Sequence, residues 1–238
     1  MKIALIGFGR MGKAIAEKAP AMGHEVALVI GRDNQQDFTP VKLRCCDVAI
    51  EFTNPETAPD NILRCLEAGI PVVSGTTGWL HRLPEIVASA ERCKGAFFYA
   101  SNFSIGVNLF FALNRYLAKM MAPHPEYGVS ITETHHLHKK DAPSGTAITL
   151  AEGIIAGLDR KTSWSNPPAT DPAVLEIQSL REGEVPGTHE VIYFSETDSI
   201  LLRHEAHSRE GFVKGALLAA AWLPGRQGVF GMEDLLGY

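Results

Sequence analysis

The first hundred residues alternate short apolar runs with segments of helical composition. The apolar runs lie at residues 2–6, 24–30, 47–53, 71–78 and 96–104. Between them, segments such as "KAIAEKAPAMG" (13–23) and "APDNILRCLEAGI" (58–70) have helical composition and end near a glycine. Apolar strands that alternate with helices predict a parallel sheet with helices on both faces.

The pattern changes after residue 104. Residues 105–122 predict one long helix, "YGVSITETHHLHK" (127–139) alternates like a strand, and "TAITLAEGIIAGL" (146–158) predicts another helix. Three strand-like stretches with short polar connectors follow, at 174–181, 188–195 and 199–207. Hairpin-length connections predict an antiparallel or mixed sheet with helices on one face.

These patterns predict an α/β fold of two domains. Residues 1–104 form the first domain, residues 105–208 the second, and the Ala/Leu-rich helix at 209–225 suits close packing that returns residues 209–238 to the first. The segment 163–173, "SWSNPPATDPA", is the best candidate for a mobile loop.

Composition narrows the class of protein. A chain of 238 residues with a formal charge of −5 is long enough for a sizeable core and is a poor candidate for nucleic-acid binding. Its four cysteines (Cys45, Cys46, Cys65 and Cys93) show no metal-ligand spacing, which favours a reducing compartment. The first apolar run is broken by glycine and Arg10, so we expect a cytoplasmic protein with no membrane span.

A glycine pattern directly follows the first predicted strand. Gly7, Gly9 and Gly12 fit G-x-G-x-x-G between a strand and a helix, which is the context of a dinucleotide-binding turn. After the second strand, an acidic residue would bind the ribose hydroxyl of NADH and an arginine the 2′-phosphate of NADPH. Arg32 and Asp33 offer both, and Arg32 favours NADPH.

Small polar residues end two further strands of the same predicted sheet. "SGTTG" (74–78) and "ASNFS" (100–104) lie where open α/β sheets bind ligands. Each stretch is also compatible with an ordinary loop.

The stretch "HHLHKKDAPSGTA" (135–147) joins histidines and lysines to a helix start. Ser144 or Thr146 would cap that helix, whose N-terminus beside Lys139 would attract anions such as carboxylates. His135 could carry a proton near neutral pH, as a general acid must. A metal site, a solvated edge strand and a helix start with a basic flank are the alternatives, although no H-E-x-x-H pattern or cysteine pair supports metal binding.

These residues resemble the dihydrodipicolinate reductase family, the 4-hydroxy-tetrahydrodipicolinate reductases of bacterial lysine and diaminopimelate synthesis. The likeness rests on "ETHHLHKKDAPSGTA" and on four further stretches in the same order: "IGFGRMG", "GTTG", "SNFSIGVN" and "LREGEVPGTHEV". The closing "LLAAAWLPGRQGVFGMEDLL" extends it to the end of the chain.

The resemblance implies a Rossmann-like cofactor domain, a substrate domain with an open mixed sheet, and a homotetramer. It implies that His135 is the proton donor, that Lys139 is a second catalytic residue, and that His136, Gly145 and Thr146 bind a dicarboxylate substrate. NADPH or NADH would bind at three segments: Gly7, Phe8, Gly9, Arg10, Met11 and Gly12; Gly75, Thr76 and Thr77; and Ala100, Ser101, Asn102 and Phe103.

Two departures from the family pattern bear on the cofactor. Gly31 stands where relatives often carry an acidic residue, and few residues separate Asp33 from Asp47, so a helix of the full Rossmann pattern is expected to be missing. Two rival functions remain: another NAD(P)-dependent oxidoreductase of small amino or hydroxy acids, and a dinucleotide-sensing regulator. The regulator is disfavoured because the chain has no evident DNA-binding helix pair or basic face.

Overall fold

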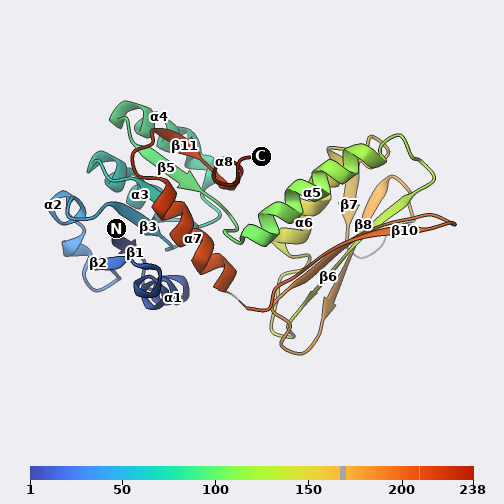
Figure 1. The fold of residues 1–238 in the computed structure, drawn as a ribbon, viewed down its shortest axis with the longest axis horizontal. Helices are drawn as coiled ribbons and strands as arrows, with labels where there is room; N and C mark the ends of the chain where they lie inside the picture. The colour runs from blue at the N-terminus through green and yellow to red at the C-terminus, as the bar shows by residue number, and fades with distance from the viewer. Residues whose placement is uncertain (167–169, 209) are drawn as a thin grey trace. The chain divides into compact units, whose positions relative to one another are not determined.

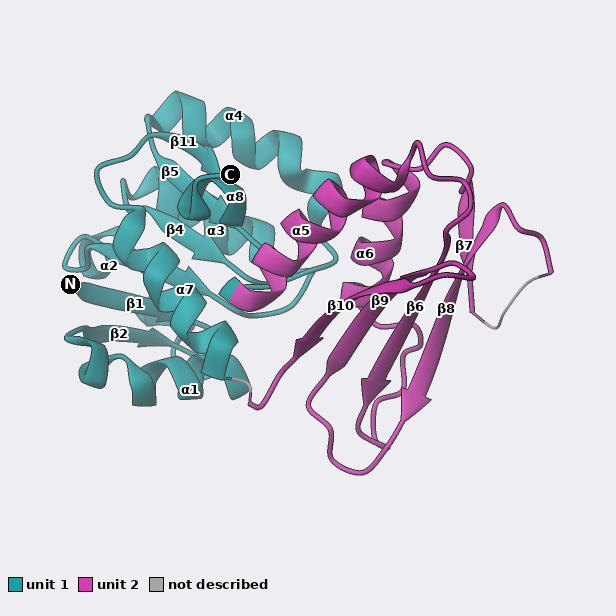
Figure 2. Cartoon of the chain, turned by 45° about the vertical axis from the view of Figure 1, so that its right-hand side comes forward, with its two compact units in different colours: residues 1–105, 210–238 teal, residues 106–209 magenta. Residues whose placement is uncertain are grey.

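The computed structural model describes residues 1–166, 170–208 and 210–238, which form two compact units. Unit 1 comprises residues 1–105 and 210–238, and unit 2 comprises residues 106–209 (Figure 2). Residue 209, where we expected a domain boundary, and residues 167–169 of the expected loop lie outside the described residues.

Unit 1 is built on a six-stranded parallel sheet (Figure 1). The strand order is β11-β5-β4-β3-β1-β2. The strands are β1 (Lys2–Ile6), β2 (Glu25–Ile30), β3 (Val48–Glu51), β4 (Val72–Ser74), β5 (Ala96–Tyr99) and β11 (Gly228–Phe230). This arrangement confirms the Rossmann-like parallel sheet expected from the alternating pattern.

Helices cover both faces of this sheet. They are α1 (Arg10–Lys18), α2 (Pro40–Leu43), α3 (Ala58–Glu67), α4 (Leu83–Cys93), α7 (Glu210–Trp222) and α8 (Met232–Leu236), with 3₁₀ turns at Pro20–Met22, Gln35–Asp37 and Leu80–Arg82. Successive residues of a strand point to opposite faces. Ile3 and Leu5 therefore join a core with α1 and α7, whereas Ala4 and Ile6 join a core with α3 and α4.

Several elements of unit 1 differ from the predicted ones. The strands expected at 47–53, 71–78 and 96–104 end early, at Glu51, Ser74 and Tyr99, because the following polar residues leave the sheet as loops. The stretch between Asp33 and Asp47 holds only a 3₁₀ turn and the one-turn helix α2, as its length predicted. The pattern did not predict β11 or α8, whose three and five residues are too short to give a period.

Unit 2 is a five-stranded mixed sheet in the order β10-β9-β6-β8-β7. Its strands are β6 (Gly128–His135), β7 (Ser163–Ser165), β8 (Val174–Arg181), β9 (Thr188–Phe194) and β10 (Ser199–Glu205). Strand β6 pairs antiparallel with β9 and parallel with β8, which makes the sheet mixed, as predicted. Strand β7 falls inside the segment expected as a loop, so that expectation is wrong for Ser163–Ser165.

Two helices, α5 (Ile105–Met121) and α6 (Gly145–Ile155), contribute to the core on one face of the unit 2 sheet. Val129 and Ile131 of β6 are buried in this core with Leu150 of α6. The same alternation continues to Glu133 and His135, which are buried on the helix-covered face. Two ionisable side chains therefore extend the buried face of β6.

Among the described residues, no helix combines the length and the apolar character needed to cross a membrane.

Candidate active site

A pocket of about 760 Å³ lies in unit 1 where β1, β2 and β3 end. Its lining comes from the segments that follow these strands and from α1 and α3: Gly7, Phe8, Gly9, Lys13, Ile30, Gly31, Arg32, Asp33, Gln35, Phe52, Thr53, Asn54, Thr57 and Asn61. The carboxyl ends of parallel strands are where open α/β sheets bind ligands. The pocket is therefore the candidate dinucleotide site.

The three glycines of the turn differ in what surrounds them. A Cβ on Gly7 would lie 2.1 Å from the Phe52 carbonyl oxygen, and one on Gly12 would lie 2.2 Å from the Gly7 carbonyl oxygen. A Cβ on Gly9 would meet no protein atom within 4 Å. Gly7 and Gly12 are thus required by packing, whereas the open side of Gly9 leaves room for a ligand.

The N-terminus of α1 fits an anionic group. No side chain caps the helix at Gly9, so its first amides are available to a phosphate. Together with the pocket and the open side of Gly9, this is the arrangement that a dinucleotide pyrophosphate requires.

The segment after β2 contains Arg32 and Asp33, and both are exposed at the pocket. The Asn34 side chain holds the turn, because Oδ1 accepts from the Gly31 amide at 2.7 Å and Nδ2 donates to the Val29 carbonyl at 2.8 Å. Arg32 has no hydrogen-bond or ion-pair partner within the described parts of the chain. Its guanidinium is therefore available to bind a ligand in the pocket.

A fully buried carboxyl, Glu51, links the segments after β3 and β4. It accepts from the Ser74 hydroxyl at 2.6 Å, from Thr76 at 3.0 Å and from the Thr53 hydroxyl, while the Thr53 amide donates to Thr76 Oγ1 at 2.8 Å. Burial raises the pKa of Glu51 against the effect of these hydrogen bonds. This network explains how Thr53 is held in the pocket wall.

The other predicted cofactor residues do not line this pocket. Arg10, Met11 and Gly12 form the first turn of α1. Gly75 is required by packing, because a Cβ there would lie 2.0 Å from the Phe52 ring, and the Phe103 side chain is buried in the unit 1 core. Among the rest, Thr76 and Ala100 are buried, Asn102 is half-buried, and Thr77 and Ser101 are exposed.

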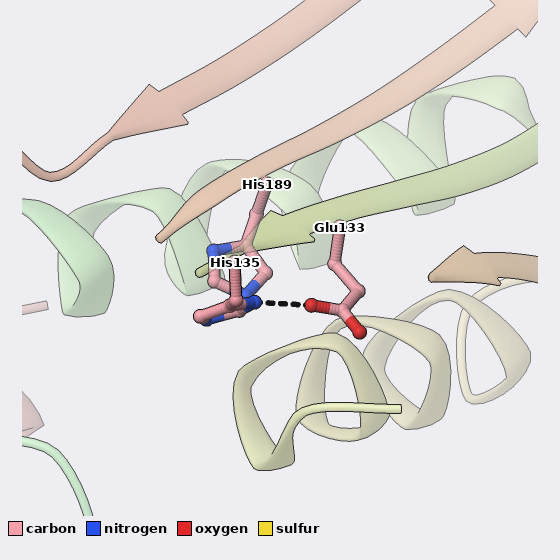
Figure 3. A group of neighbouring side chains, drawn as sticks. All are labelled: Glu133, His135 and His189. Carbon is pink, nitrogen blue, oxygen red and sulfur yellow. Dashed lines mark hydrogen bonds and ion pairs between the residues drawn. The ribbon is translucent and has the colours of Figure 1, made fainter. Parts of the chain in front are cut away.

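In unit 2, the buried end of β6 carries a contact between His135 and Glu133 (Figure 3). His135 Nδ1 lies at hydrogen-bond distance from Glu133 Oε2. The Glu133 side chain is fully buried and that of His135 is 11% exposed. Residues two apart in a strand share a face, which is why the sequence Glu-Thr-His forms this pair.

Arg181, at the end of β8, donates hydrogen bonds to the other oxygen of Glu133. Its Nη1 and Nη2 each donate to Oε1 at 3.0 Å, and Nη2 also donates to the Asp141 carbonyl at 2.8 Å. Burial would raise the pKa of Glu133, but hydrogen bonds from His135, Ser179 and Arg181 outweigh it and lower the pKa to about 2. Glu133 is therefore an anion at neutral pH.

His189, on β9, packs edge-on against His135 with ring centroids 5.1 Å apart. Its Nε2 is hydrogen-bonded to Ser144 Oγ at 2.9 Å, and Ser144 caps α6 by accepting from the Ala147 amide at 3.2 Å. Burial, and after it the proximity of His135, lower the pKa of His189 to about 3. A neutral imidazole thus connects the proton-donor candidate to the start of α6.

Acidification is expected to destabilise the fold through His189. Its pKa falls from 6.5 to about 3 on folding, so the unfolded chain binds the extra proton between these values. The free energy of unfolding should decrease as pH falls below 6.5, by up to about 1.4 kcal/mol per pH unit. Glu133 acts in the same direction below 4.5, because folding lowers its pKa to about 2.

Urea denaturation at pH 7, 6 and 5 measures this effect. The His189→Gln variant keeps an amide near Ser144 but cannot titrate, so it should show a smaller decrease than the wild-type chain. Equal decreases in the free energy of unfolding of the two proteins would show that His189 is not the source of the pH dependence.

The predicted substrate residues lie along the segment from β6 to α6. His136 lines a hollow of about 330 Å³ with His138, Glu184, Pro186 and Ser208. Lys139 Nζ is paired with Asp141 Oδ2 at 2.5 Å. Gly145 and Thr146 form the first turn of α6, and a Cβ on Gly145 would meet no protein atom within 4 Å. Space is therefore available to a ligand at the helix N-terminus.

The comparisons with known proteins agree along the whole chain. The family model described as dihydrodipicolinate reductase, N-terminus, matches residues 1–103, and the one described as dihydrodipicolinate reductase, C-terminus, matches residues 106–236. The chain belongs to the dihydrodipicolinate reductase family.

Curated relatives match over nearly their full length. A protein of Christiangramia forsetii named 4-hydroxy-tetrahydrodipicolinate reductase is 45% identical over 99% of this chain and 98% of the relative. One of the same name from Zymomonas mobilis is 38% identical over 100% of this chain and 97% of the relative.

Solved structures share the fold at lower identity. A dipicolinate-bound dihydrodipicolinate reductase from Paenisporosarcina sp. TG-14 has a TM-score of 0.78, with 22% identity over 98% of each chain. An aspartate dehydrogenase from Thermotoga maritima has a TM-score of 0.51, with 13% identity over 92% of this chain and 94% of that one. Both likenesses show a shared fold, and the likeness to the reductase is the greater.

The sequence of this family member did not identify Glu133, Arg181 or His189 as candidate site residues. The spacing of Glu133 and His135 on one predicted strand was an available signal, since both point to the same face. Arg181 and His189 gave no local signal, because strand register alone brings them there: His135 pairs with Arg181 and Glu133 with His189.

One donor group resembles a metal site. Glu133, His135 and His189 each present a ligand atom within 4.8 Å of the other two. Arg181 already places its positive charge on the Glu133 carboxylate, and His135 occupies the second oxygen. Like-charge repulsion between Arg181 and a bound cation opposes metal binding here. The hydrogen bond between Glu133 and His135 and the ring contact between His135 and His189 explain the trio.

Proposed function

We propose that this chain catalyses the NAD(P)H-dependent reduction of 4-hydroxy-tetrahydrodipicolinate, through dihydrodipicolinate, to tetrahydrodipicolinate in lysine and diaminopimelate synthesis. The observation that carries the proposal is the pair of family models that together match residues 1–103 and 106–236. The full-length relatives that bear this enzyme name support it.

The reaction adds one hydride and one proton to the ring that forms when the substrate loses water. A reduced nicotinamide cofactor held at the Gly7–Gly12 turn would supply the hydride, which adds to ring carbon C4. The π electrons displaced by that addition move toward the ring nitrogen and leave an enamine, which must gain a proton at carbon. His135, as an imidazolium, donates this proton from the nitrogen that Glu133 does not occupy.

The segment between β6 and α6 supplies the remaining contacts of this proposal. The Lys139 ammonium stabilises negative charge that develops on the ring. Amides of Gly145 and Thr146, in the first turn of α6, bind a substrate carboxylate with support from the helix dipole, and His136 adds a polar contact. The free space beside Gly145 supports this assignment.

Fold and family imply a nicotinamide cofactor, and we propose NADPH as the preferred form. The Gly7–Gly12 turn would bind the pyrophosphate, and the segments Gly75–Thr77 and Ala100–Phe103 would lie along the rest of the cofactor. Arg32 supports the choice of NADPH, because it is exposed at the pocket and Gly31 replaces the acidic residue typical of NADH binding.

Replacing Arg32 with Ala should raise the KM for NADPH about tenfold to a hundredfold, since a charge-assisted hydrogen bond contributes about 1.5–3 kcal/mol. The KM for NADH should stay within about twofold, because that coenzyme lacks the 2′-phosphate. Initial rates with both coenzymes measure the ratio of the two KM values. Asp33→Ala is the comparison variant, for which any loss should be greater with NADH than with NADPH. An equal loss with both coenzymes in Arg32→Ala would contradict the assignment.

We also propose a cytoplasmic homotetramer that assembles through the outer face of the unit 2 sheet. Leu180, Phe194 and Leu201 are exposed, and the strand pairings put them with Ile192 on the face opposite the helices. An apolar group of this kind on a sheet face favours self-association. Sedimentation velocity of the wild-type chain and of Leu201→Glu tests it, with a smaller species expected for the variant.

A coupled assay tests the function. Substrate made in situ by dihydrodipicolinate synthase should cause oxidation of NADPH or NADH that depends on both the synthase and this chain. Reduction of NADP⁺ or NAD⁺ by small amino or hydroxy acids instead would favour the rival oxidoreductase, and dinucleotide binding without any turnover would favour a regulator.

A further inference from the structure

The proton-donor candidate contacts a residue of opposite charge, Glu133, to which the proposed function assigns no role of its own. A carboxylate has no hydrogen to donate, so in the contact between Glu133 and His135 the imidazole Nδ1–H is the donor. Glu133 is fully buried, and its other oxygen accepts hydrogen bonds from both terminal nitrogens of Arg181. The carboxylate therefore cannot rotate away without breaking two strong hydrogen bonds.

The charged and titratable groups around His135 come from four parts of unit 2. Glu133 lies on the same strand, Arg181 on β8 and His189 on β9, while Lys139 and its partner Asp141 lie in the turn after β6. Arg181 and Lys139 oppose a positive charge on His135, and His189 is neutral because its pKa is about 3. Glu133 is the anion in direct contact with the imidazole.

The second ring nitrogen of His135 is kept clear by a glycine. A Cβ on Gly187, which has φ of +154°, would lie only 3.0 Å from Nε2. Any other residue at this position would crowd the one nitrogen of His135 that Glu133 leaves open. Nδ1 is thus engaged and Nε2 remains available.

We propose that Glu133 is the positioning residue of the proton donor: it accepts Nδ1–H, stabilises the imidazolium, and directs the transferred proton to Nε2, which Gly187 leaves unobstructed. This inference rests on the proposed function only for its effect on turnover. The proton passes from Nε2 to the substrate carbon, and the bond between Nδ1 and its hydrogen stays intact. Arg181 acts through Glu133 by holding the carboxylate in place.

The Glu133→Gln variant removes the charge but keeps the size and an acceptor oxygen. We expect kcat to fall about tenfold to a hundredfold, in line with the loss of one hydrogen bond to a charged group, while the KM for the coenzyme stays within about twofold. The pH above which kcat declines should move to a lower value, because the imidazolium loses its counter-charge. A matched control is Glu152→Gln at an exposed position of α6, which should leave both quantities unchanged.

A double-mutant cycle separates positioning from general stabilisation. In a His135→Gln background, Glu133→Gln should change kcat by less than about twofold, because the group it acts through is gone. The same loss in both backgrounds would overturn the proposal, as would wild-type kcat with an unchanged pH profile in the single variant.

A second measurement does not depend on activity or on the variant folding. In the ¹⁵N-histidine spectrum of the wild-type chain, the proton that remains on neutral His135 should sit on Nδ1. A proton found on Nε2 would overturn the proposal even if the chain reduces the substrate. Absence of substrate reduction together with the Nδ1–H form would instead reject only the proposed function.

Discussion

Replacing His135 with Gln is expected to lower kcat by about two to four orders of magnitude, the range associated with losing general acid–base catalysis. Glutamine is close to the imidazole in size and can still hydrogen-bond to Glu133, but it cannot supply a proton near neutral pH. The KM for the coenzyme should change little, since His135 lies in unit 2 and the glycine turn lies in unit 1. Steady-state kinetics with synthase-generated substrate measures both quantities.

His138→Gln is the matched control for this loss. His138 lies three residues beyond His135, in the turn after β6, and its side chain is 78% exposed. The control should keep kcat within about twofold, as expected for an exposed position. A His135→Gln variant with near-normal turnover would remove His135 from the mechanism, whatever the control shows.

Alanine substitutions at Gly12 and Gly9 are expected to have opposite consequences, one for folding and one for ligand binding. The new methyl of Gly12→Ala would lie 2.2 Å from the Gly7 carbonyl oxygen, a backbone atom that cannot move without displacing α1 from β1. The cost should be about 3 kcal/mol or more, at or above the usual range for an overpacked site. Thermal denaturation should then occur about 6–12 °C lower.

Gly9→Ala should leave the melting temperature nearly unchanged, because its methyl meets no protein atom within 4 Å and φ of −78° is allowed for alanine. The methyl would instead occupy the space that we propose for the pyrophosphate. The dissociation constant for NADPH should then rise about tenfold to a hundredfold, equivalent to about 1.4–3 kcal/mol. Calorimetric titration with NADPH and thermal denaturation of both variants give the comparison. Unchanged NADPH affinity in Gly9→Ala would place the pyrophosphate elsewhere.

The sequence by itself determined the features of this protein that depend on neighbouring residues. The run at residues 2–6 became β1, because its side chains alternate between two buried faces. Gly7 and Gly12 could be recognised because the close packing of strand and helix in this motif requires glycine at fixed positions along the sequence. Ser144 was one of two predicted caps for α6, and the structure confirms it. Family-specific runs such as "HHLHKKDAPSGTA" identified the family and located His135.

Only the tertiary structure decided what surrounds His135. Glu133 was in the sequence beside it, but the burial that makes this pair a strong contact depends on α5 and α6 covering the sheet. Arg181 lies on β8, where the parallel register puts it opposite His135. His189 lies on β9, where the antiparallel register puts it opposite Glu133. A pairing shifted by one residue would turn these side chains to the opposite face. Register is a property of the assembled sheet: the alternation along one strand indicates which side chains share a face, but not which residue of the neighbouring strand lies opposite each of them.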